Sequence, residues 1–203
     1  MEKSKTKIVI IEDDNRLRDD PFIVEAEMLF EKVLFFDNPV EGLQYIDENL
    51  DQNNIVLLDL NFPQYLPDGH KILDSIRHWS FLIPVIIWSG RDEDKETFSD
   101  LINNKAFSFL KKSASTQEII DELLKADNYI QNDISSALEE WINAHSEEQK
   151  DKPYMVTADG KQLSLNDILK EIRLQTPIGL NFSKNLIKLT IDLISRNKEN
   201  LND

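Results

Sequence analysis

The stretch Lys7-Ile8-Val9-Ile10-Ile11-Glu12-Asp13-Asp14 decides the fold. A short apolar run that ends in acids is typical of a buried strand in a parallel sheet, where both faces of the sheet are covered. Four more runs of this kind follow, at residues 33–36, 55–59, 84–88 and 106–110. Because segments with helical periodicity separate them, the sequence predicts an α/β fold, a doubly wound five-stranded parallel sheet with helices on both faces.

The composition of the 203-residue chain is that of a globular protein and excludes several kinds of site. The chain has no cysteine, which excludes disulfides, thiolate metal sites and cysteine nucleophiles. Its three histidines are far apart in the sequence, which argues against a histidine zinc site. No apolar run reaches the ~18 residues of a membrane span, and the N-terminal residues do not resemble a signal peptide. We therefore expect a cytoplasmic protein without a membrane partner.

The net charge of −15 is unevenly distributed. Residues 127–203 carry 13 acids and 9 bases, a net charge of −4, which leaves −11 for residues 1–126. Acidity of this density repels a polyanion such as DNA, although salt confines the repulsion to about 8 Å. Acids gathered in one half of a chain are also compatible with a cation site.

Polar residues follow the predicted strands at their carboxyl ends, the edge where open parallel sheets bind ligands. Glu12 and Asp13 end the first strand and Asp59 ends the third, while Ser89 and Lys112 follow the fourth and fifth. Carboxylates held close together raise one another's pKa unless a cation is present, and Mg²⁺ prefers such hard oxygen ligands. The sequence therefore indicates a magnesium site at this edge.

Four motifs lie in order on these strand ends. They are Ile-Val-Ile-Ile-Glu-Asp-Asp (8–14), Leu-Leu-Asp-Leu-Asn-Phe-Pro (57–63) followed by Asp68-Gly69, Ile-Ile-Trp-Ser-Gly (86–90), and Phe-Leu-Lys-Lys (109–112). Together they resemble the receiver domain of two-component response regulators over about residues 6–128. The resemblance implies a flavodoxin-like sheet with strand order 2-1-3-4-5. It also implies a signalling phosphoacceptor rather than an enzyme, acting in a phosphorelay with a histidine kinase or phosphotransfer protein.

The resemblance implies a role for each matching acid. Asp59 is implied as the phosphoacceptor, which forms an aspartyl phosphate by attacking a phosphohistidine. Glu12 and Asp13 are implied as Mg²⁺ ligands, together with Asp59 and the backbone carbonyl of Asn61. Such a metal neutralises charge on the transferred phosphoryl group.

The resemblance also implies a switch. Lys112 would pair with a phosphoryl oxygen, and Ser89 would donate its hydroxyl to another. We favour Lys112 over Lys111 because neighbouring residues of a strand point to opposite faces. Phe109 occupies the position of the aromatic switch residue, although it could simply belong to the core.

Two departures from the family pattern stand out. Receivers commonly have proline after the conserved lysine, whereas this chain has Ser113, so a cis peptide cannot be assumed there. The stretch between Asp59 and Gly69 is also two residues longer than usual and carries Gln64-Tyr65-Leu66-Pro67. Neither change removes a catalytic group.

The helical pattern continues beyond Thr116. A heptad pattern places Asp127 at an a position as the polar exception. The other a and d positions are apolar and include Ile120, Leu123, Ile130, Ile134, Ala137 and Trp141. The pattern indicates either one helix of roughly 30 residues or two helices separated at Asn132-Asp133, and a homodimer could form through it. We place a receiver domain over 1–128 and a mainly helical output region over 129–203, with a polar linker at about 146–153.

The output region matches no family by its sequence and leaves three functions open. A protein-interaction or dimerisation module is favoured, because the region is small, helical and mildly acidic. The alternative is a DNA-binding transcriptional regulator with a divergent helix-turn-helix, formed by helices near 164–173 and 182–197. The net charge of −4 over residues 127–203 argues against nucleic acid. An enzyme is disfavoured, because the region has one histidine and no clustered acid–base pair. The sequence does not identify the effector protein.

Overall fold

The structure is a computed structural model that describes residues 3–63, 65–90, 106–157 and 160–199. The polar helix that the sequence predicts after the fourth strand, over residues 92–102, lies outside these ranges. Gln64, the first residue of the longer loop, lies outside them too.

Two compact units divide the chain, Met1–Asn132 and Asp133–Asp203. The boundary predicted at 128/129 falls inside the last helix of the first unit, so the observed boundary comes slightly later. In chain order, the described elements of the first unit are β1 (Ser4–Ile11), the 3₁₀ helix η1 (Asn15–Asp19), α1 (Pro21–Leu29), β2 (Phe30–Phe36), α2 (Pro39–Glu48), β3 (Asn54–Leu58), α3 (Gly69–Trp79), β4 (Val85–Ser89), β5 (Ser108–Lys111) and α5 (Thr116–Asn132).

The first unit is built on a five-stranded parallel sheet with the order β2-β1-β3-β4-β5, which confirms the predicted fold. The chain goes outward from β1 to β2 and then crosses back to β3, so the strand order reverses between β1 and β3. Ile11 at the end of β1 pairs with Leu58 at the end of β3. The residues that follow these two strands therefore meet at the crevice where doubly wound sheets bind ligands.

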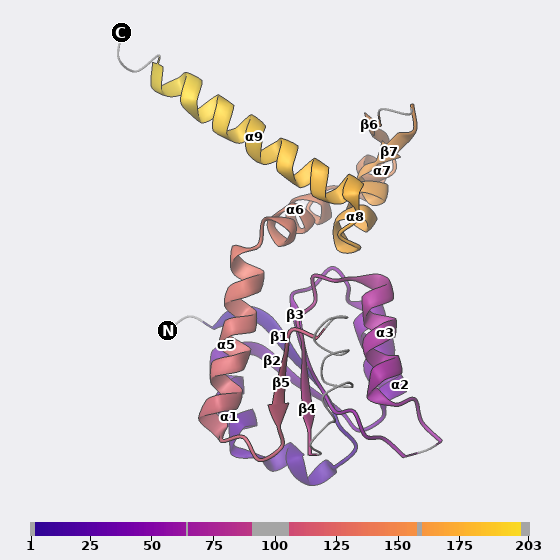
Figure 1. Cartoon of the computed structure of the whole chain (residues 1–203), viewed down its shortest axis with the longest axis vertical. Coiled ribbons are helices and arrows are strands. Elements are labelled where there is room, and N and C mark those ends of the chain that lie inside the picture. Colours follow the sequence, from indigo (N-terminus) through magenta and orange to yellow (C-terminus); the bar gives the residue numbers. More distant parts are fainter. Residues whose placement is uncertain (1–2, 64, 91–105, 158–159, 200–203) are drawn as a thin grey trace. The chain divides into compact units, whose positions relative to one another are not determined.

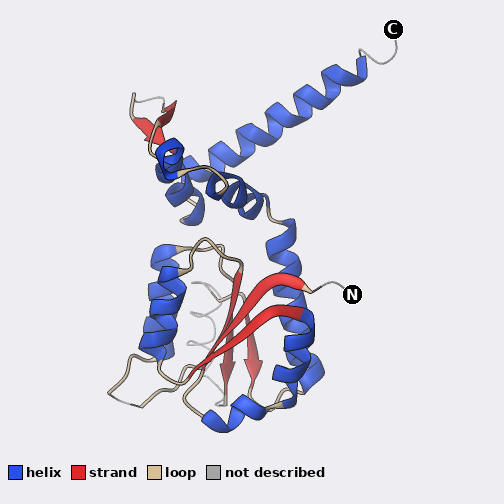
Figure 2. Cartoon of the chain, turned by 180° about the vertical axis from the view of Figure 1, so that it is seen from behind, coloured by secondary structure: helices blue, strands red, loops and turns tan. Residues whose placement is uncertain are grey.

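Strand alternation divides the core of the first unit into two layers, one on each face of the sheet (Figure 1). Ile8 and Ile10 pack with α1 and α5, whereas Val9 and Ile11 pack with α2 and α3. All four side chains are fully buried. Figure 2 shows the same layers from behind. Burial on both faces explains why this strand is a continuous apolar run.

The helical pattern after Thr116 forms two helices rather than one. α5 ends at Asn132, and Asp133 caps α6 (Ile134–Asn143) by accepting a hydrogen bond from the backbone N–H of Ser135. A capping carboxylate satisfies the first N–H groups of a new helix, so it starts α6 instead of continuing α5. Three residues of the predicted seam are buried in the core of the first unit: Ile120, Leu123 and Ile130. The single heptad seam is therefore wrong, and α5 offers these side chains to no second chain.

Asp127, the polar exception in the heptad pattern, has partners within the first unit. Its Oδ1 accepts hydrogen bonds from the hydroxyl of Ser4 at 2.8 Å and from that of Thr6 at 2.5 Å. Thr6 is fully buried. The carboxylate therefore joins α5 to the beginning of β1, which explains why an acid interrupts the apolar face of this helix.

The second unit is mainly helical and carries one small hairpin. Its elements are α6, α7 (Glu147–Lys150), β6 (Pro153–Val156), β7 (Gln162–Ser164), α8 (Leu165–Arg173) and α9 (Pro177–Glu199). β6 and β7 pair as an antiparallel hairpin, and Ser164 forms a capping box with Asp167 that starts α8. In the described part of the chain, no helix is long and apolar enough to cross a membrane.

The linker predicted at about 146–153 is wrong. Ser146 and Gln149 form a capping box that starts α7. The side chain of each residue accepts a hydrogen bond from the backbone N–H of the other. Lys150 is buried and pairs with Glu147 at 2.6 Å. Reciprocal capping lets a polar segment form a short helix without apolar burial, which a reading based on polarity overlooks.

Gly179 allows the first turn of α9 to pack on the last turn of α8. A Cβ atom at this position would lie 2.3 Å from the carbonyl oxygen of Glu171. Thr176 reinforces the contact, since its backbone N–H donates to the same oxygen at 3.1 Å. The sequence predicts a helix that begins near 182, whereas α9 begins at Pro177, because proline is tolerated in the first turn of a helix.

We expect Gly179→Ala to loosen the second unit by about 1–3 kcal/mol, because the added methyl group overpacks a backbone contact. Hydrogen exchange measured by mass spectrometry should show faster exchange in α8 and the start of α9, with the first unit unchanged. The matched control is Asn181→Ala, on the exposed side of the same turn. Unchanged exchange in Gly179→Ala would contradict the packing described.

Candidate functional site

Three acids meet where β1 and β3 end. One carboxylate oxygen from each of Glu12, Asp13 and Asp59 lies within 4.8 Å of the others. Glu12 is fully buried, Asp59 is 2% exposed and Asp13 is partly exposed. The register of β1 with β3 produces this arrangement, since Glu12 and Asp59 follow directly on the paired residues Ile11 and Leu58, and Asp13 follows Glu12. The structure thus brings the three acids together as the sequence predicts.

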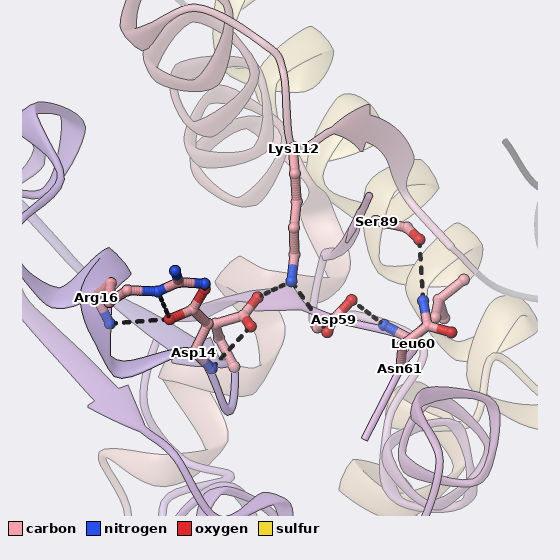
Figure 3. A network of polar contacts seen from close by, with 8 residues as sticks. Asp14, Arg16, Asp59, Leu60, Asn61, Ser89 and Lys112 are labelled. Atoms are coloured by element: carbon pink, nitrogen blue, oxygen red, sulfur yellow. Dashed lines mark hydrogen bonds and ion pairs between the residues drawn. The ribbon is translucent and has the colours of Figure 1, made fainter. Parts of the chain in front are cut away.

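Lys112 connects two of these acids (Figure 3). Its Nζ lies 2.6 Å from Oε2 of Glu12 and 3.1 Å from Oδ2 of Asp59. The backbone N–H of Lys112 donates to the carbonyl of Ser89 at 2.9 Å, which fixes the residue beside the end of β4. The Nζ also lies 5.8 Å from the ring centroid of the buried Trp88, within the range of a cation–π contact. Lys111 is the last residue of β5 and is not part of this ion pair.

The electrostatics of the cluster are dominated by burial. Burial raises the pKa of Glu12 and of Asp59, and the hydrogen bonds and charge of Lys112 only partly oppose this. For Lys112, burial acts to lower the pKa, but the hydrogen bond to Glu12 and the charge of Asp59 outweigh it, so its pKa is raised. Among the described residues of the cluster there are three carboxylates and one ammonium group, which pairs with Glu12 and Asp59, so this group of side chains carries excess negative charge.

The loop after Asp59 is held by a close backbone approach. The Oδ1 atom of Asp59 accepts from the backbone N–H of Leu60 at 2.8 Å, and the N–H of Gly69 donates to the carbonyl of Leu60 at 3.1 Å. A Cβ atom at Gly69 would lie 2.3 Å from the carbonyl oxygen of Asp59. Only glycine therefore lets the start of α3 lie against the backbone that positions Asp59.

Ser89 and Asn61 meet on the other side of Asp59. Ser89 is fully buried, and the side-chain amide of Asn61 donates to its hydroxyl at 3.4 Å. The sequence reading considered only the backbone carbonyl of Asn61, as a metal ligand. It missed the side chain, because nothing in a linear motif shows that residue 61 lies next to the end of β4.

Asp14 and Arg16 form a pair that the sequence reading also missed. The carboxylate of Asp14 accepts from Nε of Arg16 at 2.8 Å and from Nη2 at 2.6 Å, which lowers the pKa of Asp14 to about 2. The backbone N–H of Asp14 donates to Oε1 of Glu12 at 3.0 Å. Asp14 thus orients Glu12 through its backbone while its own charge pairs with Arg16. An acid two residues before an arginine at a helix start is the only sequence signal for this.

Phe109 and Ser113 complete the predicted set. Phe109 is partly buried and packs against the core layer on the α2 and α3 face. Its packing fits the core interpretation, and the switch role remains a prediction. No cis peptide occurs in the described residues, so the bond between Lys112 and Ser113 is trans.

The acidic cluster fits a magnesium ion by the chemistry of its donors. Hard carboxylate oxygens gathered at one point, with one of them partly exposed, match an ion that binds few carboxylates and keeps several waters. The excess negative charge is a further reason, because a divalent cation removes the repulsion that burial makes costly.

Comparison with known families identifies the first unit. The family model described as the response regulator receiver domain matches residues 8–124, which is more than half of the chain. The chain therefore belongs to the response regulator receiver domain family. Receiver domains generally bind Mg²⁺ through an acidic pocket and interact with histidine kinases or phosphotransfer proteins. A comparison with curated proteins found no match.

Solved structures support the same assignment. A CheY-like receiver domain protein from Methanospirillum hungatei is 20% identical, with a TM-score of 0.53 over 64% of this chain and 100% of that chain. A receiver domain protein from Clostridium thermocellum is 26% identical, with a TM-score of 0.54 over 62% and 97%. A DNA-binding response regulator of the LuxR family from Staphylococcus aureus is 25% identical, with a TM-score of 0.51 over 61% and 99%.

We expect Asp59→Asn to stabilise the chain at pH 7 by about 1 kcal/mol, the usual size of a single substitution's effect. Because the pKa of Asp59 is raised, the folded state binds more protons than the unfolded state between the two pKa values, and stability falls as pH rises through that window. The gain should therefore shrink as the pH is lowered towards 4. Urea unfolding without metal, at several pH values, measures it.

The control for this experiment is Asp14→Asn. The pKa of Asp14 is lowered, so its charge supports the folded state and its removal should give no gain at pH 7. If Asp59→Asn is instead less stable than the unaltered chain at pH 7, pairing with Lys112 outweighs burial and the electrostatic account is wrong.

Proposed function

We propose that this protein is a response regulator that accepts a phosphoryl group on Asp59 and thereby switches a C-terminal protein-interaction or dimerisation module. The observation that carries the proposal is the cluster of Glu12, Asp13 and Asp59, with Lys112 bound to two of its carboxylates. Phosphoryl transfer depends on charge neutralisation and positioning, and this cluster supplies both.

In the proposed reaction, a carboxylate oxygen of Asp59 forms a bond to the phosphorus of a phosphohistidine. The P–N bond breaks, and its electron pair stays on the imidazole nitrogen, which then takes a proton. The donor is a histidine kinase or a phosphotransfer protein. The backbone N–H of Leu60 orients the attacking carboxylate, and Lys112 is placed to pair with a phosphoryl oxygen.

Glu12, Asp13 and Asp59, with the carbonyl of Asn61, would hold Mg²⁺. When bound, this ion would offset the charge on the phosphoryl oxygens. Asp14 keeps Glu12 oriented through its backbone N–H. We propose that hydrolysis of the aspartyl phosphate is self-catalysed, so the protein signals rather than acting as an enzyme on other substrates. Because phosphohistidine donors and Mg²⁺ are cytoplasmic reactants, we propose a cytoplasmic location.

We propose that Ser89 and Lys112 report the phosphoryl group to the end of the sheet. The hydrogen bond from the backbone N–H of Lys112 to the carbonyl of Ser89 links the ends of β4 and β5. A shift of either side chain toward a phosphoryl oxygen would therefore move both strand ends together. Phe109 on β5 is the residue whose packing would follow.

A DNA-binding output is the second candidate, since one similar structure is named as a DNA-binding response regulator. That likeness spans 61% of this chain, a share no larger than the first unit. Among the described side chains of α9, the large exposed ones are mostly apolar, and Lys184 and Lys188 are the exposed bases. These features favour an interaction module. A gel shift with mixed genomic DNA at several salt concentrations distinguishes the DNA-binding output from the interaction module, since salt-dependent retardation would support the DNA-binding output.

We expect Mg²⁺ with acetyl phosphate or phosphoramidate to add one phosphoryl group to the protein, and Asp59→Asn to prevent it, because the nucleophile is lost. Intact-protein mass spectrometry measures this. The matched control, Asp14→Asn, removes a neighbouring acid outside the cluster and should still be labelled. Equal labelling of Asp59→Asn and the unaltered chain would exclude Asp59 as the acceptor.

We expect Ser89→Ala and Lys112→Ala to accept phosphate at Asp59 without passing the change to β4 and β5. Beryllofluoride, a mimic of the phosphoryl group, should protect backbone amides of these strands in the unaltered chain and less in either variant. Hydrogen exchange provides the comparison. Identical protection in all three proteins would refute the switch.

A further inference from the structure

α9 is much longer than the helices that cover it within the second unit. It runs over 23 residues, whereas α6 has 10 and α8 has 9. At a rise of 1.5 Å per residue, α9 spans about 35 Å and α8 about 14 Å. Its first turns pack on α8 and α6, with Gly179 and Ser183 buried. Figure 1 shows the remainder of α9 extending beyond these two helices.

The apolar side of α9 continues beyond the turns that α8 and α6 cover. At 100° per residue, the side of α9 that contains the buried Gly179 and Ser183 continues with Leu186, Leu189, Thr190 and Leu193. Leu189 and Leu193 are each 52% exposed. The narrow opposite side carries the polar residues Asn181, Lys184 and Lys188.

Exposed aromatic side chains lie at the base of the same helix. Phe182 of α9 contacts Tyr154 of β6 at 6.5 Å between ring centroids, and Tyr154 contacts Trp141 of α6 at 6.0 Å. Trp141 is 40% exposed and Tyr154 is 52% exposed. Because Phe182 lies on the same side of α9 as Leu189 and Leu193, the aromatic cluster and the apolar side of α9 form one continuous surface.

We propose that this surface binds the same surface of a second copy of the chain, with the two α9 helices antiparallel and crossing between Leu189 and Thr190. The pairing places Leu186 of each helix opposite Leu193 of the other. It also brings the last turn of each α9 to the aromatic cluster of the partner. The inference concerns the second unit alone and holds whether or not Asp59 is phosphorylated.

The size of the surface suits a second copy. The large exposed apolar residues on this side are Trp141, Tyr154, Leu189 and Leu193, with Ile187 at its margin. At roughly 100 Å² for each side chain, they offer roughly 500 Å² per chain, about the 1,000 Å² in total that a specific interface needs. The residues along the middle of the surface are uncharged, so a copy meets no like charge there.

Charge favours the antiparallel orientation. Residues 177–199 carry four bases and two acids, a net charge of +2, whereas residues 133–176 carry nine acids and five bases, a net charge of −4. In an antiparallel pair, the end of each α9, whose residues 193–199 carry two bases and one acid, comes to the acidic bundle of the other chain. A parallel pair would set like charges side by side, and its helix dipoles would also be aligned.

Sedimentation of the full chain tests the proposal. We expect a dimer at tens of micromolar and at least a tenfold weaker association for the double variant Leu189→Glu/Leu193→Glu. The matched control is Lys188→Glu, on the polar side of the same turns, which should remain dimeric. Circular dichroism checks that helix content is unchanged. A monomer at 100 μM in the unaltered chain, or a dimer in the double variant, would overturn the proposal.

Single cysteines test the orientation independently, because the chain has none of its own. Thr190→Cys should form a disulfide-linked dimer on mild oxidation, whereas Lys188→Cys on the polar side should not. Leu193→Cys should not either, since antiparallel helices separate the two copies of residue 193 by about 10 Å along the axis, beyond disulfide reach. Efficient linkage through Leu193→Cys would show a parallel pair and refute the proposed arrangement.

Discussion

The Nζ atom of Lys112 lies between the carboxylates of Glu12 and Asp59, and this ion pair sets the electrostatics of the first unit. Burial raises the pKa of both acids, so their ionised forms are held at a cost that one ammonium group only partly offsets. This cost falls at the edge of the sheet where a bound divalent cation would offset the negative charge. An unfavourable electrostatic arrangement at one site is expected where function, not stability, determines the residues.

The remaining features of the first unit support that edge. Gly69 lets α3 approach the backbone of Asp59, and the backbone bond between Lys112 and Ser89 links the ends of β5 and β4. Asp14 holds Glu12 while its own charge is bound by Arg16. The side chains of the acidic cluster are thus positioned by backbone contacts of rigid elements, which fix them more firmly than flexible side chains could.

The second unit is built differently from the first, because most of its helices are short and begin with side-chain caps. Asp133, Ser146 and Ser164 start α6, α7 and α8. α9 departs from this pattern, since its apolar side extends past the helices that cover its first turns. An uncovered apolar side of this length gives the second unit a surface at which another chain can bind.

The sequence by itself determined the sheet, its order and the acids at its edge, because buried parallel strands are continuous apolar runs and their ends meet by topology. It also indicated a break at Asn132-Asp133 as one of two possible interpretations of the helical pattern. Only the tertiary structure decided that α5 buries Ile120 and Leu123 in its own unit, since heptad spacing is the same whether the facing surface is a sheet or another helix. It alone showed the side chain of Asn61 beside Ser89, because contacts between residues 28 positions apart depend on packing that no local pattern records.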